Sequence, residues 1–298
     1  MIESLLFITW NPSLEAFSFG PISIRWYSLM WLIGLALAYL MVRWLYKKQN
    51  IPNEKFEPLF IYCFMGILIG ARLGHCIFYQ PDYFLTSWKG FVEMMLPIKI
   101  TEDGWHMTGY QGLASHGGTL GLMLSLLLYV KHFKVPAWTV LDNIAIATGI
   151  TACCIRIGNL MNSEIIGKVT DESLPWAFWF VQNDGPQNVV LRHPGQLYEA
   201  IAYALLFLIM IILYRMSGKR LNDQTTKRPI PQVGTGFYFG LCLAYIFTFR
   251  FFIEYFKEVQ EAFEEGLPFD MGQILSIPFV ILGVYCMIRS KRNNVITK

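Results

Sequence analysis

Three arginines that could bind a phosphate group lie inside long apolar stretches of this sequence: Arg72, Arg156 and Arg250. Arginine can bind phosphate oxygens in a bidentate manner and stays charged at any physiological pH. Glu254 follows Arg250 by four residues, so both side chains would share one helical face and the carboxylate could hold the guanidinium. His116 could move a proton near neutral pH. This set favours an anionic ligand such as a phospholipid headgroup.

The stretches that carry these residues predict membrane-spanning helices. Of the 298 residues, 54% are apolar and 15% are charged, against about 25% charged in a typical soluble domain. The aromatic content of 16% excludes a disordered chain, and the net charge of +3 gives nucleic-acid binding no support. A bilayer-spanning helix needs about 20 mostly apolar residues. Seven stretches qualify: Ile24–Tyr46, Pro58–Tyr79, Gly112–Tyr129, Leu141–Ile157, Gln196–Tyr214, Gly236–Tyr255 and Met271–Ile288.

We therefore predict an all-α, polytopic membrane protein, with residues 1–298 forming a single integral membrane domain. Of the 24 Lys and Arg residues, fifteen lie at the end of the first, third, fifth or seventh stretch or in the segment that follows it. Basic residues accumulate in cytoplasmic loops, so we expect the N-terminus outside and the C-terminus in the cytoplasm. Two long loops, roughly Gln80–Gln111 and Gly158–Gly195, then lie on the outer side. The leading segment Met1–Pro21 predicts an interfacial segment that lies on the membrane.

Polar side chains in the predicted spans gather at their outer ends, which favours a polar cavity in the outer half of the bilayer. Snorkelling to the headgroups explains Arg25 or Lys257, but it explains the three embedded arginines and His116 less well. Asp142, at the inner start of the fourth span, is the exception, explained by a helix cap or by a lysine partner. The outer set is Arg25, Tyr27, Arg72, His75, His116, Arg156, Asn159, Asn162, His193, Gln196, Tyr198, Glu199, Arg250, Glu254 and Gln273, with Glu164 just beyond the fourth span.

Glycines and cysteines within the spans have mainly structural explanations. Glycines at positions 66, 70 and 74 recur every four residues, a spacing that lets membrane helices pack closely. Gly117 and Gly118, directly after His116, are explained equally well by packing and by a substrate that approaches the backbone. The six cysteines all lie in or at the ends of apolar spans and are expected to be buried small hydrophobes. No Cys–His cluster has the spacing of a zinc site, so we expect no metal and no cofactor.

Several strings together resemble one protein family. Residues 156–167, RIGNLMNSEIIG, closely resemble the signature of bacterial prolipoprotein diacylglyceryl transferases, and Ser115–Gly118 resembles the family's His-Gly-Gly motif. Further matches are RWY at 25–27, GARLG at 70–74, RHPGQLYE at 192–199, RFFIE at 250–254 and MGQILS at 271–276. These strings occur in family order from the first span to the last, which makes the resemblance specific.

The resemblance implies a reaction at the outer leaflet of the bacterial plasma membrane. The diacylglyceryl group of phosphatidylglycerol passes to the lipobox cysteine of a prolipoprotein signal peptide, a thioether forms and glycerol phosphate leaves. Arg156 and Arg250 would then clamp the phosphate, and Glu254 would hold Arg250. His116 would be the base for the thiol or would orient the headgroup. Residues expected to bind phosphatidylglycerol are Arg156, Tyr27, Asn159, Gly167, Arg72, Glu164, Gly117 and Gly118.

The roles of some residues and the class of membrane protein have alternatives at this point. Glu199 and Tyr198 either orient the arginines or belong to a structural belt at the interface. Tyr245 stands five residues before Arg250, where the family has a tyrosine at a shorter distance, so its role is undefined. A transporter or flippase would show inverted repeats and broken helices, which the sequence lacks. A receptor-like seven-helix protein would need no such arginines, and another phospholipid-using transferase is the nearest alternative. The oligomeric state is not predicted.

Overall fold

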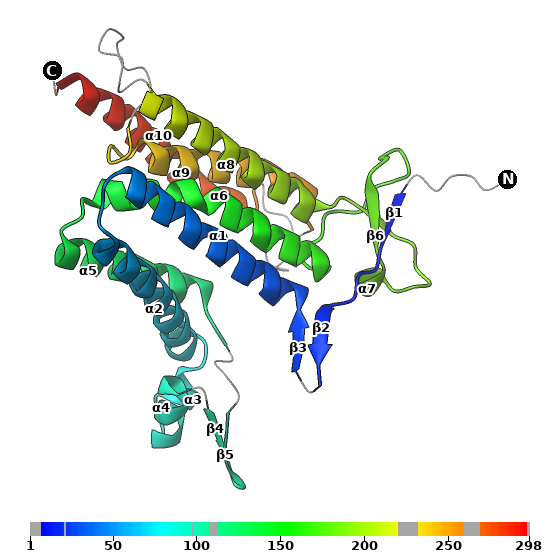
Figure 1. The fold of residues 1–298 in the computed structure, drawn as a ribbon. Coiled ribbons are helices and arrows are strands. Elements are labelled where there is room, and N and C mark those ends of the chain that lie inside the picture. The colour runs from blue at the N-terminus through cyan, green and yellow to red at the C-terminus, as the bar shows by residue number, and fades with distance from the viewer. Residues whose placement is uncertain are drawn as a thin grey trace. The chain divides into compact units, whose positions relative to one another are not determined.

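The computed structural model describes residues 7–20, 22–96, 98–107, 112–219, 232–258 and 269–296, most of which are helical (Figure 1). Six of its helices are long and apolar enough to cross a membrane. They are α1 (Trp26–Lys48), α2 (Asn53–Phe78), α6 (Ala137–Met161), α8 (Gly195–Lys219), α9 (Phe237–Ile253) and α10 (Met271–Ile296). The prediction of a mostly helical, polytopic membrane protein is confirmed. The fourth predicted span was too short, because α6 extends it by four residues at each end.

The third predicted span corresponds to α5 (Ser115–Phe133), a helix of 19 residues that is not among these six. Its first turn contains His116 and two glycines, and its last turn contains Lys131 and His132. These polar ends leave a shorter apolar stretch than in the other long helices. Seven spans are therefore not confirmed, although the predicted third helix itself is present.

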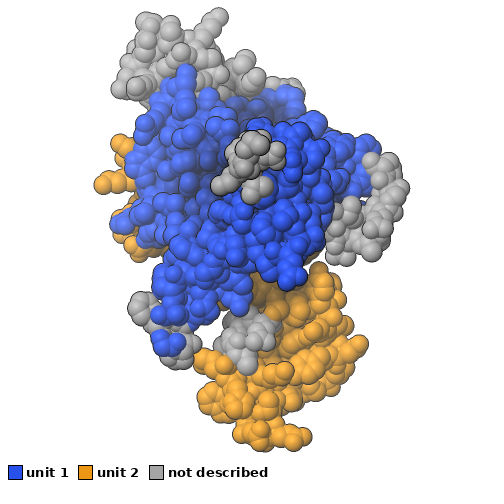
Figure 2. Space-filling model, turned by 90° about the vertical axis from the view of Figure 1, so that its right-hand side faces the viewer, with its two compact units in different colours: residues 1–45, 138–298 blue, residues 46–137 orange. Residues whose placement is uncertain are grey.

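The chain divides into two compact units, shown in Figure 2: unit 1, residues 1–45 and 138–298, and unit 2, residues 46–137. In unit 2, α2 and α5 pack through their glycines. A Cβ atom at Gly70 would lie 2.4 Å from the carbonyl oxygen of Gly117, and one at Gly117 would lie 2.3 Å from that of Gly70. No side chain fits at either position, which confirms the packing role of the Gly70 region and assigns one to Gly117. A Cβ at Gly118 would make only an ordinary contact, 3.4 Å from Ala71.

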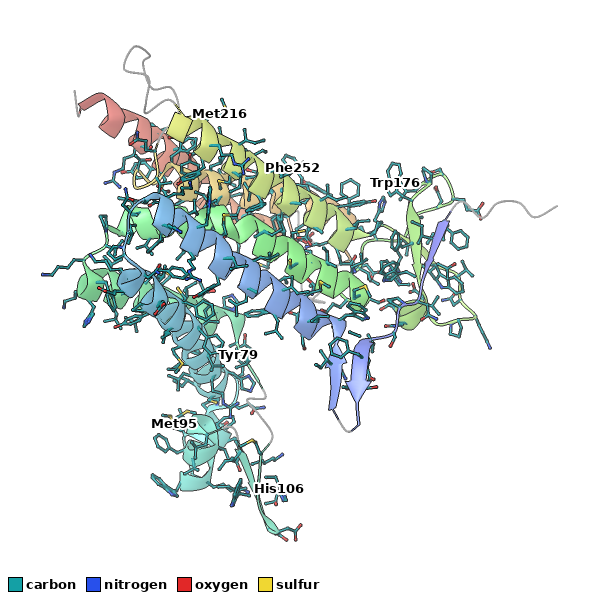
Figure 3. All side chains as sticks on the ribbon, viewed as in Figure 1. Tyr79, Met95, His106, Trp176, Met216 and Phe252 are labelled. Carbon is teal, nitrogen blue, oxygen red and sulfur yellow. The ribbon has the colours of Figure 1, made fainter. Side chains whose placement is uncertain are left out.

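Unit 2 also contains part of the first long loop, which is folded. It forms the short helices α3 (Pro81–Phe84) and α4 (Trp88–Met95), followed by the antiparallel strands β4 (Ile98–Thr101) and β5 (Gly104–Met107). Ser87 caps α4, because its hydroxyl accepts from the N–H of Gly90 at 3.0 Å. Met95, the last residue of α4, and His106 of β5 are labelled in Figure 3.

In unit 1, short strands precede α1 and α8. β1 (Phe7–Trp10) pairs in parallel with β6 (Ala177–Phe180), which pairs antiparallel with β7 (Leu191–Arg192). β2 (Glu15–Phe19) and β3 (Ile22–Arg25) form a hairpin that leads into α1, and α7 (Val181–Asp184) follows β6. The all-α prediction missed these strands because runs of two to five residues are too short to show a periodicity. The predicted interfacial segment also covers Met1–Leu6 and Pro21, which lie outside the described residues.

The helices of unit 1 pack around a buried apolar cluster. The cluster includes Leu45, Ile146, Leu206, Met210, Phe237, Tyr238 and Cys242. Outward-facing apolar residues such as Phe252, 59% exposed on α9, suit lipid contact (Figure 3).

Asp142 of α6 is fully buried, and its carboxylate accepts from the N–H groups of Gly234, Gly236 and Phe239 at 2.8, 3.0 and 2.9 Å. The helix-cap explanation of Asp142 is thus confirmed, with the cap formed on α9.

Candidate active site

Four elements of unit 1 bring charged side chains together. The C-terminal end of α6 carries Arg156 and Asn159, three residues apart and therefore on one face. The first turns of α8 carry Glu199. Arg250 lies in the last turn of α9, and the short 3-10 helix η2 (Glu254–Phe256) continues the chain so that Glu254 stays on the same face. The sequence analysis predicted that these polar groups lie in one region, and the structure brings together those that belong to unit 1.

Arg156 is the first centre of this group. Its Nε lies 3.1 Å from Oε2 of Glu199, and its Nη1 donates to Oδ1 of Asn159 at 3.1 Å. Asn159, 4% exposed, donates in turn through Nδ2 to Oε1 of Glu164 at 2.8 Å. The loop after α6 is held against α8 because Gln196 donates through Nε2 to the carbonyl of Glu164 at 2.6 Å. The guanidinium is therefore fixed from two sides.

Arg250 is the second centre, and it is linked to the first. Its Nε lies 3.6 Å from Oε1 of Glu254, at the i, i+4 spacing that the sequence predicted. Lys257 bridges the two centres, because its Nζ lies 3.8 Å from that same oxygen and 3.2 Å from Oε1 of Glu199. Glu199 is fully buried and Lys257 is 3% exposed, whereas the side chain of Arg250 is 40% exposed. The structure thus links Arg156, Glu199, Lys257, Glu254 and Arg250 in a charge-alternating chain.

Gly167 lies where two other segments meet. Its N–H donates to the carbonyl of His193 at 3.1 Å, and the N–H of Lys168 donates to the carbonyl of Phe256 at 2.8 Å. A Cβ atom at Gly167 would lie 2.3 Å from the His193 oxygen and 2.8 Å from the Phe256 oxygen. The glycine is therefore needed for a close approach of the chain's own backbone, and this approach aligns Gly167 with Lys257 in an antiparallel bridge.

Tyr27 stands beside the same region. It is the second residue of α1, and its ring packs against Gly158 of α6, where a Cβ would lie 3.1 Å from Cδ2 of Tyr27. The charges of Glu164 and Arg156 act on its hydroxyl. All predicted site residues of unit 1 thus belong to one neighbourhood.

The other four predicted residues, Arg72, His116, Gly117 and Gly118, belong to unit 2. Arg72 of α2 holds α4: Nη2 donates to the carbonyl of Glu93 at 2.7 Å, Nε donates to that of Met94 at 3.3 Å, and the guanidinium lies 4.9 Å from the ring centre of Phe84. The visible role of Arg72 is to bind the C-terminal carbonyls of α4. His116, the second residue of α5, is exposed.

The Glu93 carboxylate completes this attachment in unit 2. It accepts from the hydroxyl of Tyr83 at 2.5 Å and from the N–H of Ile100 at 2.8 Å. Burial raises the pKa of the Glu93 carboxyl, but these hydrogen bonds and the charges of two lysines outweigh burial and hold the pKa below its ordinary value. The ionised carboxylate therefore connects α3, α4 and β4.

The sequence of this chain is similar to those of one protein family. The family model described as prolipoprotein diacylglyceryl transferase matches residues 14–289. A relative from Bacteroides fragilis is 55% identical over 288 residues, which cover 96% of each chain. Others from Tolumonas auensis and Porphyromonas gingivalis are 38% and 37% identical and cover 95% and 98% of this chain and 97% and 98% of their own. All three are named phosphatidylglycerol–prolipoprotein diacylglyceryl transferase. This chain belongs to the prolipoprotein diacylglyceryl transferase family.

In this prolipoprotein diacylglyceryl transferase family member, two charged residues have more contacts than the sequence suggested. Snorkelling was the wrong explanation for Lys257, which is buried and ion-paired rather than extended to the surface. Its position three residues after Glu254 was a usable signal, because that spacing places both on one helical side. Glu199 orients Arg156, which decides between the two explanations of this residue. Tyr245 packs against the apolar cluster of unit 1.

In the part of the chain that the structure describes, the thiols and metal-ligating groups form no second centre. Five of its six cysteines are buried and Cys63 is half-buried, as expected for small hydrophobes, and all six are free thiols. Within the described ranges, no group of three or more His, Cys, Asp or Glu side chains could hold a metal ion. The chemistry of the described site is that of arginine, lysine, carboxylate and amide groups.

Proposed function

We propose that this chain transfers the diacylglyceryl group of phosphatidylglycerol to the lipobox cysteine of prolipoproteins, the first step of bacterial lipoprotein maturation. The sulfur bonds to the glycerol carbon that carries the phosphate ester, the carbon–oxygen bond breaks, and glycerol phosphate leaves with the electron pair. The thiol gives up its proton, because the thiolate is the nucleophile. The observation that carries the proposal is the chain of ion pairs between two arginines in a member of this family.

Arg156 and Arg250 clamp the phosphate in this proposal. Charge grows on the departing phosphate in the transition state, and fixed donors aimed at it lower the barrier. Arg250 suits this role, because its side chain is 40% exposed and its Nε lies 3.6 Å from Oε1 of Glu254. Arg156 is fixed through Nε and Nη1, so its plane is set before a ligand arrives. Glu254 is the group that orients Arg250.

The remaining residues of unit 1 position the headgroup. Asn159 and Tyr27 hydrogen-bond its glycerol, and Glu164 orients Asn159 through the 2.8 Å hydrogen bond. Gly167 provides a close backbone approach. Its tight fit against His193 and Phe256 supports the view that any side chain there would deform the site.

His116 is the proposed base for the thiol, with orientation of the headgroup as its alternative role. Its exposed place at the start of α5 leaves the imidazole accessible to a substrate. Arg72, Gly117 and Gly118 remain proposed contacts of phosphatidylglycerol. For Arg72 and Gly117, this role would come in addition to the structural contacts with α4 and with Gly70.

The proposed setting is the bacterial plasma membrane, with the active site towards the outer leaflet. We propose α5 as a seventh span, in one membrane domain with the N-terminus outside and the C-terminus in the cytoplasm. The distribution of the basic residues supports this orientation, because fifteen of 24 lie at the ends of alternate spans or in the segments that follow them.

The test is label transfer from phosphatidylglycerol that is radiolabelled in its acyl chains to a lipobox peptide, catalysed by the purified chain in nanodiscs. Label on the peptide cysteine, with none on a Cys→Ser peptide, supports the proposal. No transfer under conditions in which the Bacteroides fragilis relative is active would refute it. Label transfer from phosphatidylethanolamine alone would favour another phospholipid-using transferase.

Two sets of variants test the assigned roles. Arg156→Ala and Arg250→Ala should each lower kcat/KM by about 100-fold or more, and full activity in either would disprove the clamp. His116→Gln should abolish the rate-limiting proton transfer, and an unchanged rate would remove His116 as the base. His193→Gln is the matched control, because His193 is a half-buried histidine whose Nδ1 lies 3.2 Å from the Tyr198 hydroxyl.

A further inference from the structure

Lys257 is buried in the middle of the chain of ion pairs. Its side chain is 3% exposed, and its Nζ is within 3.2 Å of one oxygen of Glu199 and 3.8 Å of one oxygen of Glu254. Removing one member of a buried ion pair leaves an uncompensated charge, which is strongly unfavourable. Lys257 therefore adds a second cation to each of two carboxylates that are already paired with Arg156 and Arg250.

The backbone holds Lys257 in place from both sides. Gly167 pairs with it in an antiparallel bridge, and the N–H of Lys257 donates to the carbonyl of Glu254 at 3.2 Å. Its aliphatic stem passes Gly195, where a Cβ would lie 3.7 Å from Cγ of Lys257. Its neighbour Glu258 is ion-paired to Arg192. These contacts fix the direction in which the ammonium group points.

The position of Lys257 changes the net charge of the ion-paired group. Arg156, Lys257 and Arg250 supply three positive charges, and Glu199 and Glu254 supply two negative charges, so the linked group keeps one net positive charge. Without the lysine the two carboxylates would neutralise the two arginines completely. Carboxylates that pair fully with guanidinium groups compete with a phosphate for the same donors.

We propose that Lys257 is a positioning residue that engages Glu199 and Glu254 and so leaves Arg156 and Arg250 with the net positive charge needed to bind a phosphodiester. This inference rests on the proposed function for the identity of the ligand, the anionic headgroup of phosphatidylglycerol. Lys257 acts through the arginines and need not touch the substrate. Its proposed role is electrostatic and includes no proton transfer.

The experiment compares four full-length variants in nanodiscs with the wild type: Lys257→Met, Lys257→Arg, the double variant Glu199→Gln with Lys257→Met, and Lys168→Met. The readouts are kcat and KM for phosphatidylglycerol, the unfolding temperature, and the Kd of short-chain phosphatidylglycerol. Lys168→Met is the matched control, because Lys168 lies on the paired backbone segment but is exposed.

Lys257→Met should raise KM and Kd and lower kcat/KM by about 10-fold to 100-fold, less than the loss of a direct donor. Lys257→Arg should recover most of this, because arginine keeps the charge and cannot act as a base. Compared with Lys257→Met, the double variant should have a lower KM and a higher unfolding temperature, because it restores one net positive charge. Lys168→Met should match the wild type.

Three results would overturn the inference. The first is a folded Lys257→Met variant with wild-type KM and Kd. The second is a folded Lys257→Arg variant as inactive as Lys257→Met, which would indicate proton transfer by the lysine. The third is a folded double variant with no recovery of KM. If the wild type binds phosphatidylglycerol but transfers no label, the proposed reaction fails instead, and the Kd values alone decide the role of Lys257.

Discussion

Gly167→Ala should inactivate the protein through backbone displacement, although it adds a single methyl group. The new Cβ would lie 2.3 Å from the carbonyl oxygen of His193 and 2.8 Å from that of Phe256. Both obstacles are main-chain atoms, so no side-chain rotation relieves the contact. The two flanking segments must move apart by about 1 Å to restore an ordinary contact of roughly 3.4 Å.

The cost of that movement follows from the hydrogen bonds it breaks. Gly167 N–H to His193 and Lys168 N–H to Phe256, at 3.1 and 2.8 Å, would both lengthen. Each such bond contributes about 1 kcal/mol, and overpacking typically costs about 1–3 kcal/mol more. A loss of about 3 kcal/mol at the site would lower activity by about 100-fold. Lys257, bridged to Gly167, would move with the displaced segment.

Gly195→Ala is the matched control for this substitution. The contacts of a Cβ at Gly195 begin at 3.7 Å, to Cγ of Lys257, so the methyl group fits without displacement. Both variants should be compared by thermal unfolding in nanodiscs and by transfer of radiolabelled diacylglyceryl to a lipobox peptide. Equal activity of Gly167→Ala and Gly195→Ala would refute the reasoning.

Three further predictions concern stability. Asp142→Ala should lower the free energy of unfolding by about 2–4 kcal/mol, measured by denaturant titration in detergent, because three N–H groups at the start of α9 lose their acceptor. The folded structure lowers the pKa of Glu93, so the carboxylate stabilises the fold at neutral pH and this stabilisation is lost as the pH falls through the folded-state pKa. Hydrogen exchange at the N–H of Ile100 should then accelerate. Glu93→Gln should abolish this pH dependence. Gly70→Ala should lower the unfolding temperature markedly and Gly118→Ala only slightly, because their Cβ atoms would meet another atom at 2.4 and 3.4 Å; equal shifts would contradict the packing model.

The long apolar helices of the fold were predictable from the sequence, whereas its short strands and long-range contacts were not. Six helices were found from apolar length alone, because the length of an apolar run is a strong signal. The strands β1 and β6 pair residues that are about 170 positions apart, for which no local pattern exists. The first long loop could be recognised as long, but its helices and hairpin depend on tertiary contacts such as those of Arg72 and Glu93.

The candidate site shows the same division between residue type and geometry. The Arg250–Glu254 pair was predictable, because four-residue spacing on a helix implies contact. The partners of Arg156 were harder to assign, since Glu199 comes from another helix 43 positions later and could equally have been an interfacial residue. Lys257 was misjudged because a lysine at the end of a span usually reaches the headgroups. Its burial and its ion pairs with Glu199 and Glu254 show that the side chain points inward.

The number of arginines is therefore a poor measure of how well such a site binds an anion. Arg156 and Arg250 each have a carboxylate oxygen within 3.6 Å. Isolated buried guanidinium groups would be costly in a membrane, and fully paired ones would have little attraction for a phosphate. A third cation placed between the two carboxylates resolves this conflict, because every charge has a partner while one positive charge remains in excess. For the proposed phosphate site, we therefore expect the geometry of the acids to affect the affinity for the headgroup as much as that of the arginines does.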